Sequence, residues 1–306
     1  MKKQTKFIWT TKVTSKGQIV IPKEARDVFK INEGDTLILL GDLSRGIAIA
    51  KYDDYVKFAD AIIKAKSGEI MIKINNLTKT FGKLVAVNNV SLEIEDNCCF
   101  ALLGLNGAGK TTLINMLTTS INPTSGSAEI NGLNLTSDVK NIRKIINISP
   151  QENAVAKNLT VKENLELLAG LYSILNPTEK IAKIIEDFGL KEKENARAKT
   201  LSGGQIRRLS IALAVLTDPQ ILFLDEPTLG LDVKARRTLW EKIAELKHRM
   251  TIVLTTHYLE EVEFLADRVG IISRGVLKTV GTVDEIKKAT GKPTLEAAFV
   301  SLAEEE

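Results

Sequence analysis

The stretch GLNGAGKTT, from Gly104 to Thr112, is the motif that says most about the fold. It fits the pattern G-x-x-x-x-G-K-[ST], whose glycines let backbone N–H groups turn toward phosphate oxygens. An apolar run, CCFALL, precedes it, and a helical pattern, TTLINMLTT, follows it. A strand, a glycine-rich turn and a helix in this order predict a phosphate-binding loop, and the helix N-terminus adds a favourable field for an anion. The loop residues expected to contact a nucleotide are Gly104, Asn106, Gly107, Ala108, Gly109, Lys110, Thr111 and Thr112.

A second apolar run, ILFLDEP, ends in two carboxylates, Asp225 and Glu226. Ligands of parallel sheets bind outside the carboxyl ends of the strands, so acidic residues at this point are candidates for chemistry. We expect Thr111 and Asp225 to hold Mg²⁺, and Glu226 to orient or deprotonate an attacking water. Lys110 is expected to reach the β- and γ-phosphates of the nucleotide.

The third motif is LSGGQ, from Leu201 to Gln205, directly before the helical pattern IRRLSIALAVL. Taken alone, a serine and two glycines at a helix start are typical of a helix cap. In this order and spacing, the three motifs resemble the ATP-binding cassette (ABC) family, whose signature is LSGGQ, over about residues 70–290. The resemblance implies that the signature closes in trans over ATP held by a second copy. The signature residues concerned are Ser202, Gly203, Gly204 and Gln205.

Four further residues match motifs of that family. Gln151, in SPQEN, matches the glutamine loop that contacts Mg²⁺ and senses the membrane partner. Asp232, in LGLD, matches the loop at the dimer contact, and His257, in LTTHYLEEVE, matches the histidine that contacts the γ-phosphate. Phe81, in LTKTFGKLVAV, matches the aromatic that stacks on adenine, with an ordinary core residue as the alternative.

The resemblance also implies an activity and partners. One chain carries one phosphate-binding loop and one signature, which are halves of two composite sites, so a homodimer is expected. ATP and Mg²⁺ are the implied cofactors, and Glu226, His257 and Lys110 the implied catalytic residues for ATP hydrolysis. No apolar run approaches the roughly 18 residues that cross a bilayer. We therefore expect separate transmembrane permease subunits and a cytoplasmic chain, peripheral on the inner face of the cell membrane.

The last residues suggest a direction of transport. The ending GTVDEIKKATGKPTLEAAFVSL resembles that of the ATPases of drug and antibiotic exporters. The sequence therefore favours an exporter over an importer.

The first fifty residues predict a separate small domain. The β-branched runs TTKVT and QIVIP, the helical PKEARDVF and two more strands, TLILLG and GIAIAK, follow one another. The stretch KVTSKGQIVIPKEARDVFKINEGDTLIL resembles the AbrB/MazE-type swapped-hairpin DNA-binding domains, over about residues 8–52. In that family two chains exchange hairpins. A piece this small rarely buries enough apolar surface to fold alone, which also favours pairing.

The start of the chain is basic, with eight Lys or Arg against two Asp or Glu in the first thirty residues. Such an excess points to an anionic partner, and DNA is the candidate, through Lys12, Lys16, Lys23 and Arg26. The alternative is a domain that only dimerises. A hypothesis of another class is a soluble, ATP-switched DNA-binding regulator with no transport role.

These patterns together predict an α/β protein with two domains. A P-loop ABC ATPase domain, with a mixed sheet and a helical subdomain, is expected over residues 70–306. A small, mostly-β swapped-hairpin domain is expected over residues 1–52, and a helical linker over residues 53–69, where acidic residues precede lysines. Cys98 and Cys99 are adjacent, so we expect two buried thiols on opposite faces of a strand and no disulfide between them.

Overall fold

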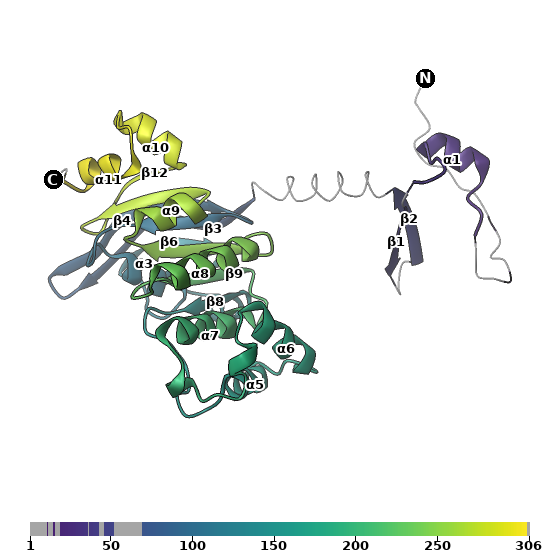
Figure 1. Cartoon of the computed structure of the whole chain (residues 1–306). Coiled ribbons are helices and arrows are strands. Elements are labelled where there is room, and N and C mark those ends of the chain that lie inside the picture. Colours follow the sequence, from purple (N-terminus) through teal and green to yellow (C-terminus); the bar gives the residue numbers. More distant parts are fainter. Residues whose placement is uncertain are drawn as a thin grey trace, which may run out of the picture. The chain divides into compact units, whose positions relative to one another are not determined.

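The computed structural model describes residues 11, 15, 19–35, 37–42, 46–51 and 69–304. The chain divides into two compact units, Met1–Lys66 and Ser67–Glu306, whose elements are labelled in Figure 1. The helix predicted over residues 53–66 lies outside the described residues, as do Lys12 and Lys16.

The first unit contains a short helix and a hairpin. Helix α1, Lys23–Phe29, begins after Pro22 and ends at Lys30, which adopts a left-handed conformation. Strand β1, Leu37–Asp42, pairs antiparallel with β2, Gly46–Lys51. In the predicted strand QIVIP, the described residues 19–22 form no strand beyond a single bridge residue, Ile19. Pro22 has no N–H to donate to a ladder, and it instead precedes the helix.

The second unit is built on a six-stranded sheet in the order β12-β11-β5-β10-β9-β8. Every neighbouring pair is parallel except β11 and β12, which are antiparallel, so the predicted mixed sheet is confirmed. Along the chain these strands are β5 Cys99–Leu103, β8 Ile146–Ser149, β9 Ile221–Asp225, β10 Thr251–Thr256, β11 Arg268–Ser273 and β12 Val276–Gly281.

A second, antiparallel sheet has the order β4-β3-β6-β7. Its strands are β3 Ile70–Phe81, β4 Leu84–Glu95, β6 Ser125–Ile130 and β7 Leu133–Asn134. The helices of the unit are α3 Lys110–Leu117, α4 Val139–Ile145, α5 Val161–Leu171, α6 Thr178–Asp187, α7 Gly203–Val215, α8 Val233–Leu246, α9 Leu259–Leu265, α10 Val283–Thr290 and α11 Leu295–Glu304. In Figure 1, α5 and α6 form the helical part beyond β8, away from the antiparallel sheet. Within the described residues, no helix is both long and apolar enough to cross a membrane.

Strands β5 and β9 of the six-stranded sheet are buried along their whole length, which explains why they are predominantly apolar runs. Along β5, Ala101 and Leu103 pack with α7, α8 and α9 on one face. Phe100 and Leu102 pack with α3 and the antiparallel sheet on the other. The two cysteines follow this alternation: both are buried and free, Cys98 in one core and Cys99 in the other, as predicted. Burial raises the pKa of Cys98 to about 12, so its thiol stays protonated.

Candidate functional site

Three parallel strands end side by side at one edge of the six-stranded sheet. Leu103, the last residue of β5, lies opposite Thr256 at the end of β10. Thr255 lies opposite Asp225, the last residue of β9. The residues that follow these strands, Gly104, His257 and Glu226, are therefore brought together although up to 153 positions separate them in sequence. This is the edge at which parallel sheets bind ligands.

A cavity of about 630 Å³ lies at this edge. Its lining includes nine predicted residues: Phe81, Asn106, Gly107, Gly109, Lys110, Thr111, Thr112, Gln151 and Glu226. Two other predicted loop residues do not line the cavity but accept hydrogen bonds through their carbonyls. The Gly104 carbonyl accepts a hydrogen bond from Lys110 Nζ, and the Ala108 carbonyl accepts one from the Gly275 N–H.

The loop shape depends on glycine at Gly109. This residue has a φ of 103°, and a Cβ there would lie 2.4 Å from the Ala86 carbonyl oxygen. A side chain at Gly109 is therefore excluded by both backbone conformation and space. The close approach holds the loop against the start of β4 and aims the first turn of α3 into the cavity.

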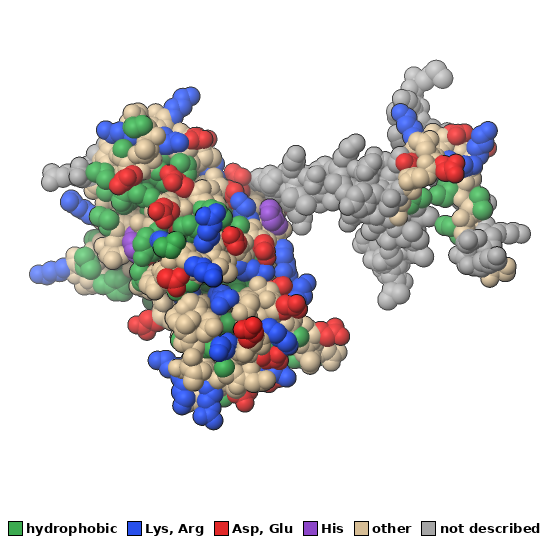
Figure 2. All heavy atoms as spheres, in the orientation of Figure 1, with side chains coloured by type: hydrophobic (Ala, Val, Ile, Leu, Met, Phe, Trp, Pro, Cys, Tyr) green, Lys and Arg blue, Asp and Glu red, His purple; other side chains and the backbone are tan. Residues whose placement is uncertain are grey.

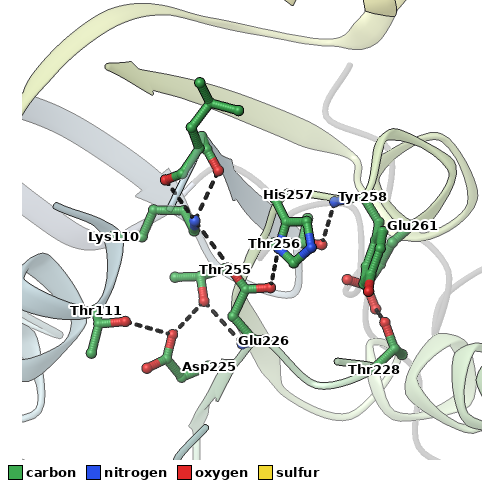
Figure 3. A network of polar contacts seen from close by, with 12 residues as sticks. Lys110, Thr111, Asp225, Glu226, Thr228, Thr255, Thr256, His257, Tyr258 and Glu261 are labelled. Carbon is green, nitrogen blue, oxygen red and sulfur yellow. Dashed lines mark hydrogen bonds and ion pairs between the residues drawn. The ribbon is translucent and has the colours of Figure 1, made fainter. Parts of the chain in front are cut away.

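An ammonium, a carboxylate and an imidazole lie next to one another at this edge of the sheet, as Figure 3 shows. Lys110 Nζ lies 3.1 Å from Glu226 Oε1, and Glu226 Oε2 lies 2.8 Å from His257 Nδ1. Lys110 and Glu226 are each only 5% exposed, so their charges are held largely out of water. Lys110 also donates to the carbonyls of Gly104 and Leu105.

The backbone of Glu226 is strained. Its φ is 48°, in the left-handed region that non-glycine residues seldom occupy. Its N–H donates to Thr255 Oγ1 at 3.0 Å, which helps to hold this conformation. Strained backbone of this kind concentrates at functional sites, because the surrounding contacts maintain it for a purpose.

Oxygen atoms cluster beside this group, where the sequence predicts Mg²⁺. Thr111 Oγ1 donates to Asp225 Oδ1 at 3.1 Å, and Thr255 Oγ1 donates to the same oxygen at 2.5 Å. A hydroxyl, a carboxylate and the amide carbonyl of Gln151 are the hard oxygen ligands that Mg²⁺ prefers. The residues present therefore fit this ion. Thr255 is a contact that the sequence analysis missed, although its place in LTTH, one residue from the end of a strand, was a signal.

The signature residues lie elsewhere on the same unit. Ser202, Gly203, Gly204 and Gln205 line a second cavity of about 450 Å³, together with Asp232. Within one chain, the structure does not bring them to the cavity of the phosphate-binding loop. Locally they cap helices: Ser202 and Gln205 form a reciprocal capping box on α7, and Asp232 accepts from the Ala235 N–H at the start of α8.

Phe81 is not a core residue, because its exposed fraction is 49%. It lines the mouth of the nucleotide cavity with the exposed Leu84 and Val85. The cavity therefore has an apolar side that suits a planar base and a polar side that suits phosphates. Leu84 and Val85 were missed from the sequence, as was Arg274, because hairpin and turn residues carry no motif of their own.

A buried acid lies next to the site, on α9. Glu261 is fully buried, and its Oε1 accepts hydrogen bonds from Thr228 Oγ1 and Trp240 Nε1, each at 2.9 Å. Thr228 lies between Glu226 and Asp232, so Glu261 holds the loop that carries both. Burial raises the pKa of the Glu261 carboxyl above its ordinary value of 4.5.

This buried acid predicts a pH-dependent stability. A raised folded-state pKa means that the stabilising effect of the protonated carboxyl is complete below pH 4.5 and is lost as the pH rises through the folded-state pKa. Glu261→Gln keeps the accepting oxygen but cannot ionise. The melting temperature of the variant minus that of the wild type should therefore increase from pH 5 to pH 8, by roughly 2–4 °C for each kcal/mol involved. Thermal unfolding across that range is the measurement, and a constant difference contradicts the assignment.

Two of the residues proposed to contact DNA lie on α1 of the first unit. Lys23 and Arg26 are both exposed, and so are Glu24 and Asp27 on the same helix. Figure 2 shows acidic and basic side chains together on this helix. The described part of the first unit therefore presents a mixed surface and not a basic stripe.

The fold and the site define a phosphate-binding-loop ATPase of the ABC class. The family model for ABC transporters matches residues 87–229. The doxorubicin resistance ATP-binding protein DrrA of Mycobacterium tuberculosis is 36% identical over 231 residues, which cover 74% of this chain and 70% of the relative. The chain belongs to the ABC transporter family, as an ATP-binding member.

Two further similarities extend this result. ABC transporter A family member 4 of Dictyostelium discoideum is 41% identical over 228 residues, or 72% of this chain, and the chain spans only 14% of that relative. A dimeric structure of an ATP-binding cassette in a post-hydrolysis state, bound to ADP and Pi, covers 69% of this chain and 98% of its own at 28% identity, with a TM-score of 0.62. The model for the bacterial antitoxin MazE matches residues 10–56, which confirms the resemblance at the N-terminus.

Proposed function

We propose that this chain is the ATP-hydrolysing subunit of an ABC exporter and powers separate membrane subunits from the cytoplasmic face of the cell membrane. The observation that carries the proposal is the contact of the buried Lys110 and Glu226, which line the nucleotide cavity, with the partly buried His257. The relative DrrA is named for doxorubicin resistance, which supports the export direction.

Each residue around the cavity has a role in ATP binding or hydrolysis that its position supports. Phe81 stacks on the adenine, and the loop N–H groups surround the phosphates. Phosphate oxygens replace the Gly104 and Leu105 carbonyls and Glu226 as partners of Lys110. Glu226 is then free to take a proton from the attacking water. His257, next to Glu226, donates a hydrogen bond to the γ-phosphate.

Thr111, Asp225 and Gln151 would hold Mg²⁺. When bound, this ion neutralises the charge that develops on the phosphate oxygens during transfer. Thr255 keeps the Asp225 carboxylate in place through its 2.5 Å hydrogen bond.

Two copies complete each ATP site. The signature residues and Asp232 line a separate cavity, so they act on nucleotide held by the other chain. The dimeric state of the related cassette supports this arrangement. We further propose that the domain over residues 1–52 pairs two chains, joined to the ATPase domain over residues 70–306 by the linker over residues 53–69. The mixed charge of α1 favours pairing over DNA binding.

Affinity capture from detergent-solubilised membranes tests the whole proposal. A tagged chain should capture membrane-spanning proteins and a differently tagged second copy. A chain that begins at residue 67 should still capture the membrane proteins, but it should lose its second copy on dilution when ATP is absent. Capture of DNA without any membrane protein contradicts the transport function and supports the ATP-switched regulator.

A further inference from the structure

A buried arginine follows the signature on α7. Arg207 lies two residues after Gln205, and its exposed fraction is only 3%. All three nitrogen atoms of its guanidinium are used. Nε donates to the Pro227 carbonyl at 2.8 Å, and Nη2 donates to the Asp225 carbonyl at 2.8 Å. Nη1 donates to the Pro150 carbonyl at 2.5 Å and to Asn153 Oδ1 at 3.4 Å.

These partners belong to two segments that line the nucleotide cavity. Pro150 and Asn153 flank Gln151, whereas Asp225 and Pro227 flank Glu226. The planar guanidinium of Arg207 thus connects the signature helix α7 to the loop that contains Gln151 and to the loop that contains Glu226. Burial lowers the pKa of Arg207 to about 10, so the group still carries its charge at neutral pH. Charge-assisted hydrogen bonds of this kind are stronger than hydrogen bonds between neutral groups.

We propose that Arg207 is a positioning residue that couples the two ATP sites of the dimer, an inference that rests on the proposed function. In that dimer, the signature of a chain contacts one nucleotide, and Gln151 and Glu226 of the same chain contact the other. A movement of the signature helix is therefore transmitted through the guanidinium to the residues that serve the second nucleotide. The contacts leave the phosphate-binding loop itself untouched, so ATP affinity does not depend on Arg207.

The substitution Arg207→Lys tests this coupling. A lysine keeps the charge, but its donors all sit on one nitrogen atom, which cannot reach the separate positions that the three guanidinium nitrogens of Arg207 occupy. The kcat for ATP hydrolysis should fall about tenfold, and the Hill coefficient should fall toward 1. A tenfold effect lies within the usual range of coupling between two sites of one protein. The KM for ATP should stay within about twofold, because a lost transition-state contact lowers kcat without changing ground-state binding.

Arg143→Lys is the matched control. Arg143 donates from Nε and Nη2 to Thr119 Oγ1 and the Thr119 carbonyl, each at 2.9 Å, away from the cavity. The variant Arg143→Lys should have a lower melting temperature than the wild type, with unchanged kcat and Hill coefficient. Both variants are assayed as full chains, well below their melting temperatures.

The proposal is overturned if folded Arg207→Lys has the wild-type kcat and Hill coefficient, or if kcat and the Hill coefficient fall equally in Arg143→Lys. Loss of fold in both Arg207→Lys and Arg207→Gln also overturns it. Amide hydrogen exchange over residues 151–154 gives a readout that does not need turnover. It should rise in Arg207→Lys only, and unchanged exchange there also overturns the coupling. Absence of turnover in the wild type, by contrast, contradicts the proposed function.

Discussion

Glu226→Gln should bind ATP and hydrolyse it about 10²–10⁴ times more slowly than the wild-type chain. The amide has nearly the shape of the carboxylate, so the cavity and its phosphate contacts remain. It cannot accept the proton of an attacking water, and it presents no charge to His257, 2.8 Å away. Because ATP then persists, the dimer closed around it should accumulate. Phosphate release and size-exclusion chromatography with Mg²⁺-ATP measure the two effects.

Glu285→Gln is the control for the loss of one carboxylate. Glu285 caps α10 through the Thr282 N–H, and a glutamine can accept the same hydrogen bond. Its turnover should equal that of the wild type. Turnover of Glu226→Gln within tenfold of the wild type would falsify the role of Glu226 as the catalytic base.

Lys110→Met should weaken ATP binding about a hundredfold or more. Truncation of one partner in a desolvated charge pair costs roughly 2–5 kcal/mol, and each 1.4 kcal/mol is tenfold in affinity. In the nucleotide-free chain the same substitution removes the ammonium 3.1 Å from Glu226 Oε1 and leaves that carboxylate buried. The variant should therefore also lose roughly 3 kcal/mol of unfolding free energy.

The double variant Lys110→Met/Glu226→Gln separates these two effects. Removal of the second charge should restore most of the stability, because no buried carboxylate then lacks the Lys110 ammonium, whereas ATP affinity should stay low. Calorimetric titration with ATP and chemical unfolding of the single and double variants complete the cycle. Equal stability of Lys110→Met and the wild type contradicts the stabilising role of the pair. Affinity within tenfold of the wild type contradicts the phosphate contact.

The local elements were predictable wherever neighbouring residues determine them. The run TIVLTT is strand β10 from its first residue to its last, and GIAIAK is β2. The glycines of the phosphate-binding loop, the serine before α7 and the carboxylates after ILFL were likewise recognisable, because backbone conformation and strand burial act over a few residues. Family resemblance then assigned roles to residues such as Phe81 and His257.

Contacts between distant segments were decided only by the tertiary structure. The order of β5, β10 and β9 in the sheet places Lys110 and His257 each within hydrogen-bonding distance of Glu226, and no periodicity encodes that order. Arg207 stood in the sequence as one of two arginines in a helical pattern. Its neighbour Arg208 reaches the carbonyls of Phe188 and Gly189 at the end of α6, whereas Arg207 reaches the loops of Gln151 and Glu226.

The fold class, the family and the chemical types gathered at the ATP site were all predictable from the sequence, because these depend on local patterns of apolar residues, glycines and carboxylates. Tertiary structure alone decided which charges are buried together and which backbone carbonyls they satisfy. The physical reason is that a charge such as that of Arg207 or Lys110 is stable away from water only where the packing of several separate segments supplies its partners.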